Sequence, residues 1–184
     1  MQVTSSDLTG PAVPAGLPGV ARRLAGSQFA EGVTPWVGRM SEALGDVGGA
    51  EAILGGKGLG HPLHPALTDL PLGCWTSATI LDFVGFKRSR AAATTLIAVG
   101  LAAAVPTAVA GLVDYRATSG SARRVASVHA VGNAVAVACY AASLQSRIRG
   151  RHYRGVLGAL AGATFSAAAG YLGGHLVLGD DSTD

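Results

Sequence analysis

Five histidines occur in this sequence of 184 residues, and four of them stand beside or within long apolar stretches. His61 and His64 precede one stretch, His129 lies inside another, and His175 lies near the end of the last. Neutral imidazole binds iron, copper, zinc or nickel, and two opposed imidazoles can hold the iron of a b-type haem. We therefore predict a haem b site with His64 and either His129 or His175 as axial ligands, and with His61 as an alternative ligand.

Residues close to these histidines fit the same interpretation. Asn133 follows His129 by one helical turn, so both belong to one helix face. Arg116, Arg123 and Arg124 are near enough in sequence to pair with the haem propionates. Glycines would leave room for the macrocycle: Gly132, Gly170, Gly173 and Gly174.

Other interpretations of the histidine pocket stay open: a metal ion, a quinone-type headgroup, or no ligand. A copper, zinc or iron ion would be bound directly by His64, His129 and His175, with Asp69 and Asp114 orienting these ligands from a second shell. The pocket could also hold no cofactor. The corresponding functions are a metal-binding or transport module and a non-catalytic membrane subunit or scaffold.

Four apolar blocks of 21 to 25 residues must position these side chains. Within blocks 91–113, 125–146 and 155–179 there is no Asp, Glu, Lys or Arg, and block 66–86 holds only Asp69 and Asp82. Each block is long enough to cross a hydrocarbon layer of about 30 Å as a helix.

The composition agrees, because apolar residues make up 49% and charged residues 14% of the chain. It excludes a disordered tail, a coiled coil and a disulfide-rich secreted miniprotein, and it counts against an ordinary soluble enzyme. The net charge of +3 does not indicate nucleic-acid binding, because the basic residues gather at the ends of apolar blocks. We predict an all-α, four-helix transmembrane bundle whose partner is the lipid bilayer.

The predicted domain organisation has three parts. Residues 1–58 form a tail with peripheral helices over 17–30 and 35–44, in which Trp36 anchors to the membrane interface. Residues 59–179 form the four-span domain, and 180–184 form an acidic tail. The four predicted spans are 65–86, 91–113, 123–146 and 155–178. Pro71 and Pro106 are expected to bend the first two.

An even number of crossings brings His61, His64, His129 and His175 to one level, on the side of both termini. The loops 87–90 and 147–154 then lie on the other side and hold seven Lys and Arg residues close to span ends. The positive-inside rule makes these loops cytoplasmic.

The remaining chemically notable residues have structural interpretations. His152 belongs to a basic loop and is expected to be solvated, and Asp82 is expected to pair with Lys87 or Arg88. Cys74 and Cys139 are expected to be small core residues, because their spacing fits no metal motif. Small residues recur every four positions on the last span and predict close helix packing: Gly158, Gly162, Ser166, Gly170 and Gly174.

The stretch 59–75, LGHPLHPALTDLPLGCW, resembles the signature of a bacterial membrane family catalogued as domain of unknown function 2231. GLVDY at 111–115, VHAVGN at 128–133 and GYLGGH at 170–175 resemble its later motifs. The resemblance covers about residues 50–178 and implies a four-span helical membrane domain.

Some members of that family resemble fusions to Rieske iron–sulfur or cytochrome-type modules, which implies electron transfer. We therefore expect an electron carrier or subunit rather than a stand-alone enzyme, passing electrons between a quinol pool and a redox protein. A homodimer or a larger membrane complex is an open alternative.

Overall fold

The computed structural model describes residues 19–45, 63–85 and 87–178, and within these ranges the chain is helical, with no strand. The elements are listed in chain order: α1 (Gly19–Ala25), α2 (Gln28–Ala43), α4 (His64–Val84), the 3₁₀ turn η2 (Lys87–Ser89), α5 (Arg90–Arg116), α6 (Gly120–Ile148) and α7 (His152–Leu178). The prediction of an all-helical chain is confirmed for the described part.

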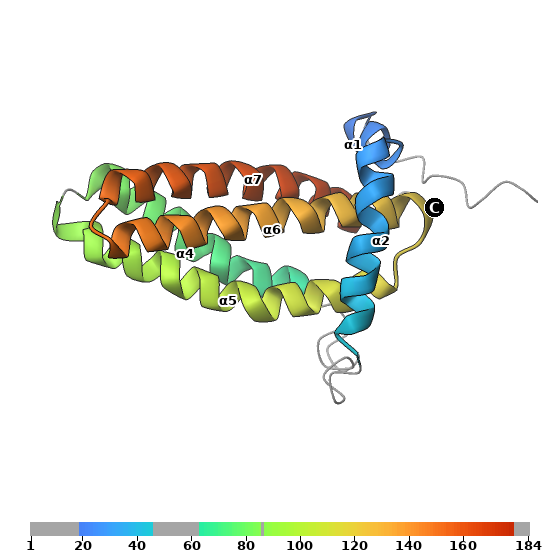
Figure 1. Ribbon diagram of the computed structural model, residues 1–184, viewed down its shortest axis with the longest axis horizontal. Helices are drawn as coiled ribbons and strands as arrows, with labels where there is room; N and C mark the ends of the chain where they lie inside the picture. The colour runs from blue at the N-terminus through green and yellow to red at the C-terminus, as the bar shows by residue number, and fades with distance from the viewer. Residues whose placement is uncertain (1–18, 46–62, 86, 179–184) are drawn as a thin grey trace, which may run out of the picture.

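The four long helices α4 to α7 lie side by side as an up-and-down bundle, and α2 crosses one end of it (Figure 1). Helix α4 packs most extensively against α5, and α6 packs most extensively against α7. The bundle therefore consists of two helical hairpins, α4–α5 and α6–α7.

Among the residues that the structure describes, three helices are long and apolar enough to cross a membrane: Lys87–Arg116, Gly120–Ile148 and His152–Gly174. Helix α4 has 21 residues but falls outside this set. Asp69, Asp82 and several hydroxyl-bearing residues lower its hydropathy, although it runs along α5. Four bundle helices are thus observed, and the crossing by α4 stays a prediction.

The peripheral helices differ from the predicted ranges. The first break falls at Ser27, whose Oγ accepts a hydrogen bond from Ala30 N at 3.2 Å and caps α2. The expectation that a helix starts at Pro35 is wrong, because α2 runs through that proline without interruption. The hydroxyl of Thr34 bonds Ala30 O at 2.7 Å in the same turn.

Helix α2 has one face on the bundle and one face outward. Val37 and Ser41 are buried, and Ser41 Oγ donates to Leu112 O of α5 at 2.9 Å. Trp36 is 64% exposed, and Phe29 is exposed near it. This arrangement agrees with a peripheral helix that presents Trp36 to the membrane interface.

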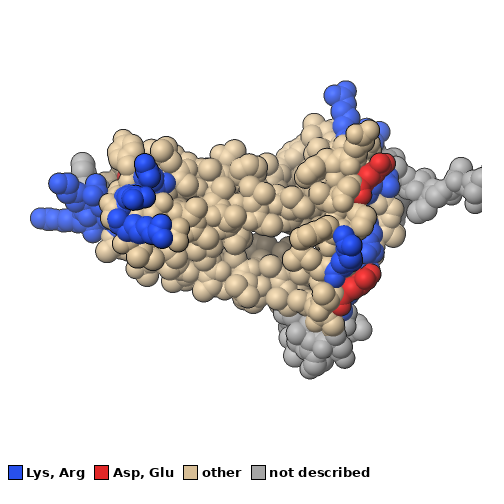
Figure 2. Space-filling model, in the orientation of Figure 1, with Lys and Arg blue, Asp and Glu red and all other residues tan. Residues whose placement is uncertain are grey.

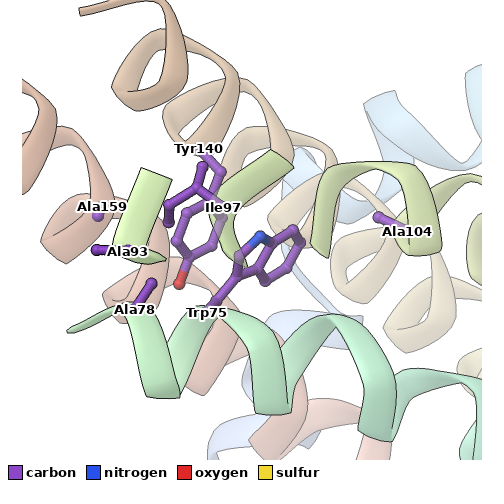
Figure 3. Packing of buried hydrophobic residues seen from close by; sticks show 7 residues of the cluster. All are labelled: Trp75, Ala78, Ala93, Ile97, Ala104, Tyr140 and Ala159. Carbon is purple, nitrogen blue, oxygen red and sulfur yellow. The ribbon is translucent and has the colours of Figure 1, made fainter. Parts of the chain in front are cut away.

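The centre of the bundle is an aromatic pair between the hairpins. Trp75 of α4 and Tyr140 of α6 stack with ring centroids 3.9 Å apart and planes 15° apart (Figure 3). A Cβ on Gly100 would overlap the Trp75 indole, and one on Gly162 would lie 2.8 Å from the Tyr140 ring. Glycine at both positions is therefore what lets α5 and α7 approach the pair.

The predicted small-residue stripe on α7 is a packing face over part of its length. Gly158 and Gly162 contact α6, and Ser166 is buried. A Cβ added at Gly170 or Gly174 would meet nothing within 4 Å among the described atoms, so close packing is wrong for that end.

Candidate functional site

His64 begins α4 and lies against α5. Pro65 follows it at the second helical position, within the first turn, where the missing N–H costs no intrahelical hydrogen bond. The Nδ1 atom of His64 is 2.9 Å from Thr107 O, and a Cβ on Gly111 would come within 2.9 Å of the ring. The glycine therefore makes the space that the imidazole occupies.

His129 lies against α7 in the same way. Its Nδ1 is 2.7 Å from Ala169 O, and a Cβ on Gly173 would come within 2.8 Å of the ring. A nitrogen that bonds a carbonyl must carry the proton, so Nε2 holds the lone pair. Asn133 Nδ2 donates to that Nε2 at 3.0 Å.

The likeness between these two histidines extends along both hairpins. Four pairs of residues are each 65 positions apart: His64 and His129, Cys74 and Cys139, Trp75 and Tyr140, and Asp82 and Arg147. Two glycine pairs on the second helices are each 62 positions apart: Gly100 and Gly162, and Gly111 and Gly173. Helices α5 and α7 both have 27 residues. The hairpins are therefore structural repeats.

This repeat explains where the site lies. His64 meets His129, Trp75 stacks on Tyr140, and the side chains of the fourth pair also contact each other. Equivalent residues therefore meet along the interface between the hairpins. The repeat was not predicted, although the sequence holds a signal for it: a histidine is followed ten and eleven residues later by cysteine and an aromatic residue, and this pattern occurs twice.

The two imidazoles come together near the end of the bundle that α2 crosses. Their ring centroids are 6.3 Å apart and their planes are perpendicular, at 89°. The topology predicted that His64 and His129 share one level, and the structure places them so. His61 and the side chain of His175 lie outside the described residues.

Small residues surround the interior next to the histidine pair. Toward the Trp75–Tyr140 stack, the buried side chains of α5, α6 and α7 are small: Ala104, Thr107, Ala136, Ser166 and Ala169. The surface in the same half of the bundle is hollowed between α5 and α6, close to α2 (Figure 2). The interior next to the histidine pair is therefore lined by small side chains.

The predicted arginines have other described contacts. Arg124 Nε donates to Ala25 O of α1 at 2.6 Å, and Arg123 stacks over the Tyr115 ring at 4.7 Å. Arg116 also donates to Ser41 O of α2 at 2.7 Å. The contacts of Arg124 and Arg116 fasten the peripheral helices α1 and α2 to the bundle.

The predicted carboxylates do not complete a metal site. Asp114 is half-buried and close enough to His64 for an electrostatic interaction, whereas Asp69 is exposed. Within 19–45, 63–85 and 87–178, no three His, Cys, Asp or Glu side chains are grouped to hold a metal ion. The described donors therefore fit a group held by two imidazoles better than a bare ion.

The opposite end of the interface holds a buried ion pair. Asp82 accepts two hydrogen bonds from Arg147 of α6, one of them 2.9 Å long, and both side chains are 1% exposed. The prediction of Lys87 or Arg88 as partner is wrong, because both of these residues are exposed. His152 Nε2 lies 3.7 Å from Asp82 and is 19% exposed, so its predicted solvation is also wrong.

The chain matches the family described as predicted membrane protein (DUF2231) over residues 60–182. It belongs to this family. No curated protein and no solved structure matched the chain. The DUF2231 match takes in both hairpins and leaves α1 and α2 outside. The family description confirms the resemblance and names a membrane protein without an activity.

Proposed function

We propose that this DUF2231 protein is a membrane electron carrier that binds one haem b between His64 and His129. The observation that carries the proposal is the pair itself: two imidazoles from equivalent helices, each with Nδ1 fixed by a backbone carbonyl. Such a hydrogen bond sets the tautomer and the ring orientation, and it makes Nε2 the nitrogen whose lone pair can bind a metal.

The spacing of the rings also supports this ligand. Two metal–nitrogen bonds of about 2 Å, with about 1.1 Å from each nitrogen to its ring centre, place the centroids roughly 6 Å apart. The observed separation is 6.3 Å. The small residues beside the pair would accommodate a planar macrocycle.

The residues of the chain have distinct tasks in this proposal. Thr107 and Ala169 hold the two rings through their carbonyl oxygens. Gly111 and Gly173 have no side chain and so leave space for the rings to pack against α5 and α7. Asn133 must release Nε2 of His129 before that atom can act as a ligand. Haem, when bound, supplies reversible one-electron oxidation and reduction of its iron.

The proposal includes α4 as the fourth crossing. A charge inside a membrane is costly unless it is paired, and Asp82 is paired with Arg147. Four crossings place the histidine pair close to one membrane surface, where a quinol or a redox protein could exchange electrons. The positive-inside rule places the loops 87–90 and 147–154 in the cytoplasm and the pair near the opposite surface.

A spectrum tests the proposal. The full chain, purified in detergent after expression with haem supply, is expected to show a Soret band and to change between ferric and ferrous forms when oxidised and reduced. His64→Ala and His129→Ala are each expected to lose the band, whereas His152→Ala should keep it. Circular dichroism and size-exclusion profiles check that each variant folds.

Two outcomes would contradict the proposal. Purified protein that takes up no haem under these conditions would favour a scaffold, particularly if partner subunits co-purify. Haem binding that survives both histidine substitutions in folded protein would exclude this ligand pair.

A further inference from the structure

A groove of about 370 Å³ opens between α5 and α6, away from the histidine pair. Its wall runs along the last turns of α6, from Ala141 to Arg149, and includes Leu101 of α5. Most of the lining is apolar, whereas Gln145 and Arg149 bring polar groups to the end where α6 stops. The groove is thus apolar along the span and cationic at its mouth.

This mouth belongs to a strongly basic end of the bundle. Seven basic residues lie there, and we call them the basic end: Lys87, Arg88, Arg90, Arg147, Arg149, Arg151 and Arg154. Arg147 is paired with Asp82, and no other acidic residue lies at this end in the part of the chain that the structure describes. Figure 2 shows mainly Lys and Arg at this end, whereas Asp and Glu stand beside Lys and Arg at the other end.

The repeat shows that the polar mouth is not required by the architecture. The equivalent positions on α4, 65 residues earlier, hold Ile80 in place of Gln145 and Val84 in place of Arg149. Both of these α4 residues are exposed. At these two positions α4 therefore presents apolar side chains, whereas the α6 positions hold an amide and a guanidinium.

We propose that the groove binds an anionic phospholipid. One acyl chain lies against Leu101, Ala141 and Leu144, and the phosphate is bound by Arg149. Because the groove runs along two helices apolar enough to cross a membrane, hydrocarbon chains surround it. Basic pockets between membrane helices attract anionic headgroups, and the charge of the basic end supplies that attraction. Guanidinium groups also bind phosphate with two parallel hydrogen bonds.

Native mass spectrometry of the full chain in detergent tests this proposal. The probes are dioleoyl phosphatidylglycerol, dioleoyl phosphatidylcholine and soluble glycerol phosphate. We expect retention of phosphatidylglycerol in preference to phosphatidylcholine. Arg149→Gln should weaken phosphatidylglycerol binding about fivefold, whereas Arg151→Gln, an equal change of charge outside the groove, should weaken it less than twofold.

A second pair of variants tests the acyl-chain part without changing charge. Ala141→Phe fills the groove and should reduce binding of phosphatidylglycerol, whereas Thr76→Phe changes the equivalent position on α4 and should not. Equal losses with Arg149→Gln and Arg151→Gln would overturn the proposal in favour of diffuse attraction. Unchanged binding in Ala141→Phe, or full competition by glycerol phosphate, would overturn the acyl-chain site.

Discussion

The hairpins α4–α5 and α6–α7 share a packing framework and differ in where they place charge. Each has a histidine on its first helix that bonds a carbonyl of the second, and each has an aromatic ring seated on a glycine. In contrast, the equivalent positions 82 and 147 hold a carboxylate in one hairpin and a guanidinium in the other. Equivalent packing positions therefore hold similar residues, and the charged position holds opposite ones.

This difference shows which pairs of equivalent residues can be buried against each other in the interface. Imidazoles and aromatic rings can face their own kind, because neither carries a fixed charge at neutral pH. Two carboxylates or two guanidiniums buried together would repel, so equivalence must be broken there. The comparison also separates the two ends, one suited to a ligand between neutral rings and one closed by an ion pair.

The largest expected effect comes from breaking the ion pair on one side only. Asp82→Ala leaves the buried Arg147 without its carboxylate and should lower the free energy of unfolding by about 3–5 kcal/mol. Unfolding of the protein in mixed detergent micelles, followed by circular dichroism, measures this change.

The double variant Asp82→Leu with Arg147→Met is the matched control. It removes both charges and should recover most of the lost stability, because no buried charge is left unpaired. A double variant as unstable as Asp82→Ala would mean that the pair does more than neutralise its own members. Charge neutralisation would then not explain why the two hairpins differ at this position.

A smaller effect is expected where the framework is shared. Gly100→Val and Gly162→Val push a side chain into Trp75 and Tyr140 respectively, and each should cost about 1–3 kcal/mol of stability. Gly73→Val, on the open surface of α4, should cost less than either. The same unfolding measurement compares all three. If one framework glycine tolerates valine while the other does not, the hairpins are not equivalent at this level.

The smallest expected effect concerns a difference between the two histidines, because only the Nε2 atom of His129 has a described hydrogen-bond partner. Asn133→Ala removes the hydrogen bond to His129 Nε2, a competitor for metal binding worth about 1 kcal/mol, and should raise haem affinity about fivefold. Thr68→Ala changes the equivalent position on α4, where the hydroxyl bonds Pro65 O, and should leave the affinity unchanged. Spectroscopic titration with haem measures both. Weaker binding in Asn133→Ala would show that Asn133 supports the ligand rather than competing with it.

Much of the fold could be predicted from the sequence, because apolar length and charge exclusion mark the long helices directly. The shared level of His64 and His129 follows from helix order alone, and the structure places the two rings 6.3 Å apart. Local chemistry was harder to predict. The Ser27 side chain caps α2 about one turn before the break that was predicted between the two peripheral helices, and Pro35 lies within α2.

Partners across the interface could not be predicted without the repeat. Asp82 pairs with a residue 65 positions away rather than with the nearby Lys87, because burial selects a partner from a neighbouring helix. The carbonyl partners of the two histidines depend on the rotation of α5 and α7, which apolar blocks of near-uniform composition do not encode. The glycines that admit the rings are therefore recognisable only after the helices are placed.

The ligand pair at the hairpin interface is tested most directly by low-temperature electron paramagnetic resonance of the ferric, haem-loaded protein. The account predicts a low-spin signal from one haem per chain, as two imidazole ligands require, and its replacement by a high-spin signal or by loss of haem in either His64→Ala or His129→Ala. A low-spin signal that persists unchanged in both folded variants would contradict it.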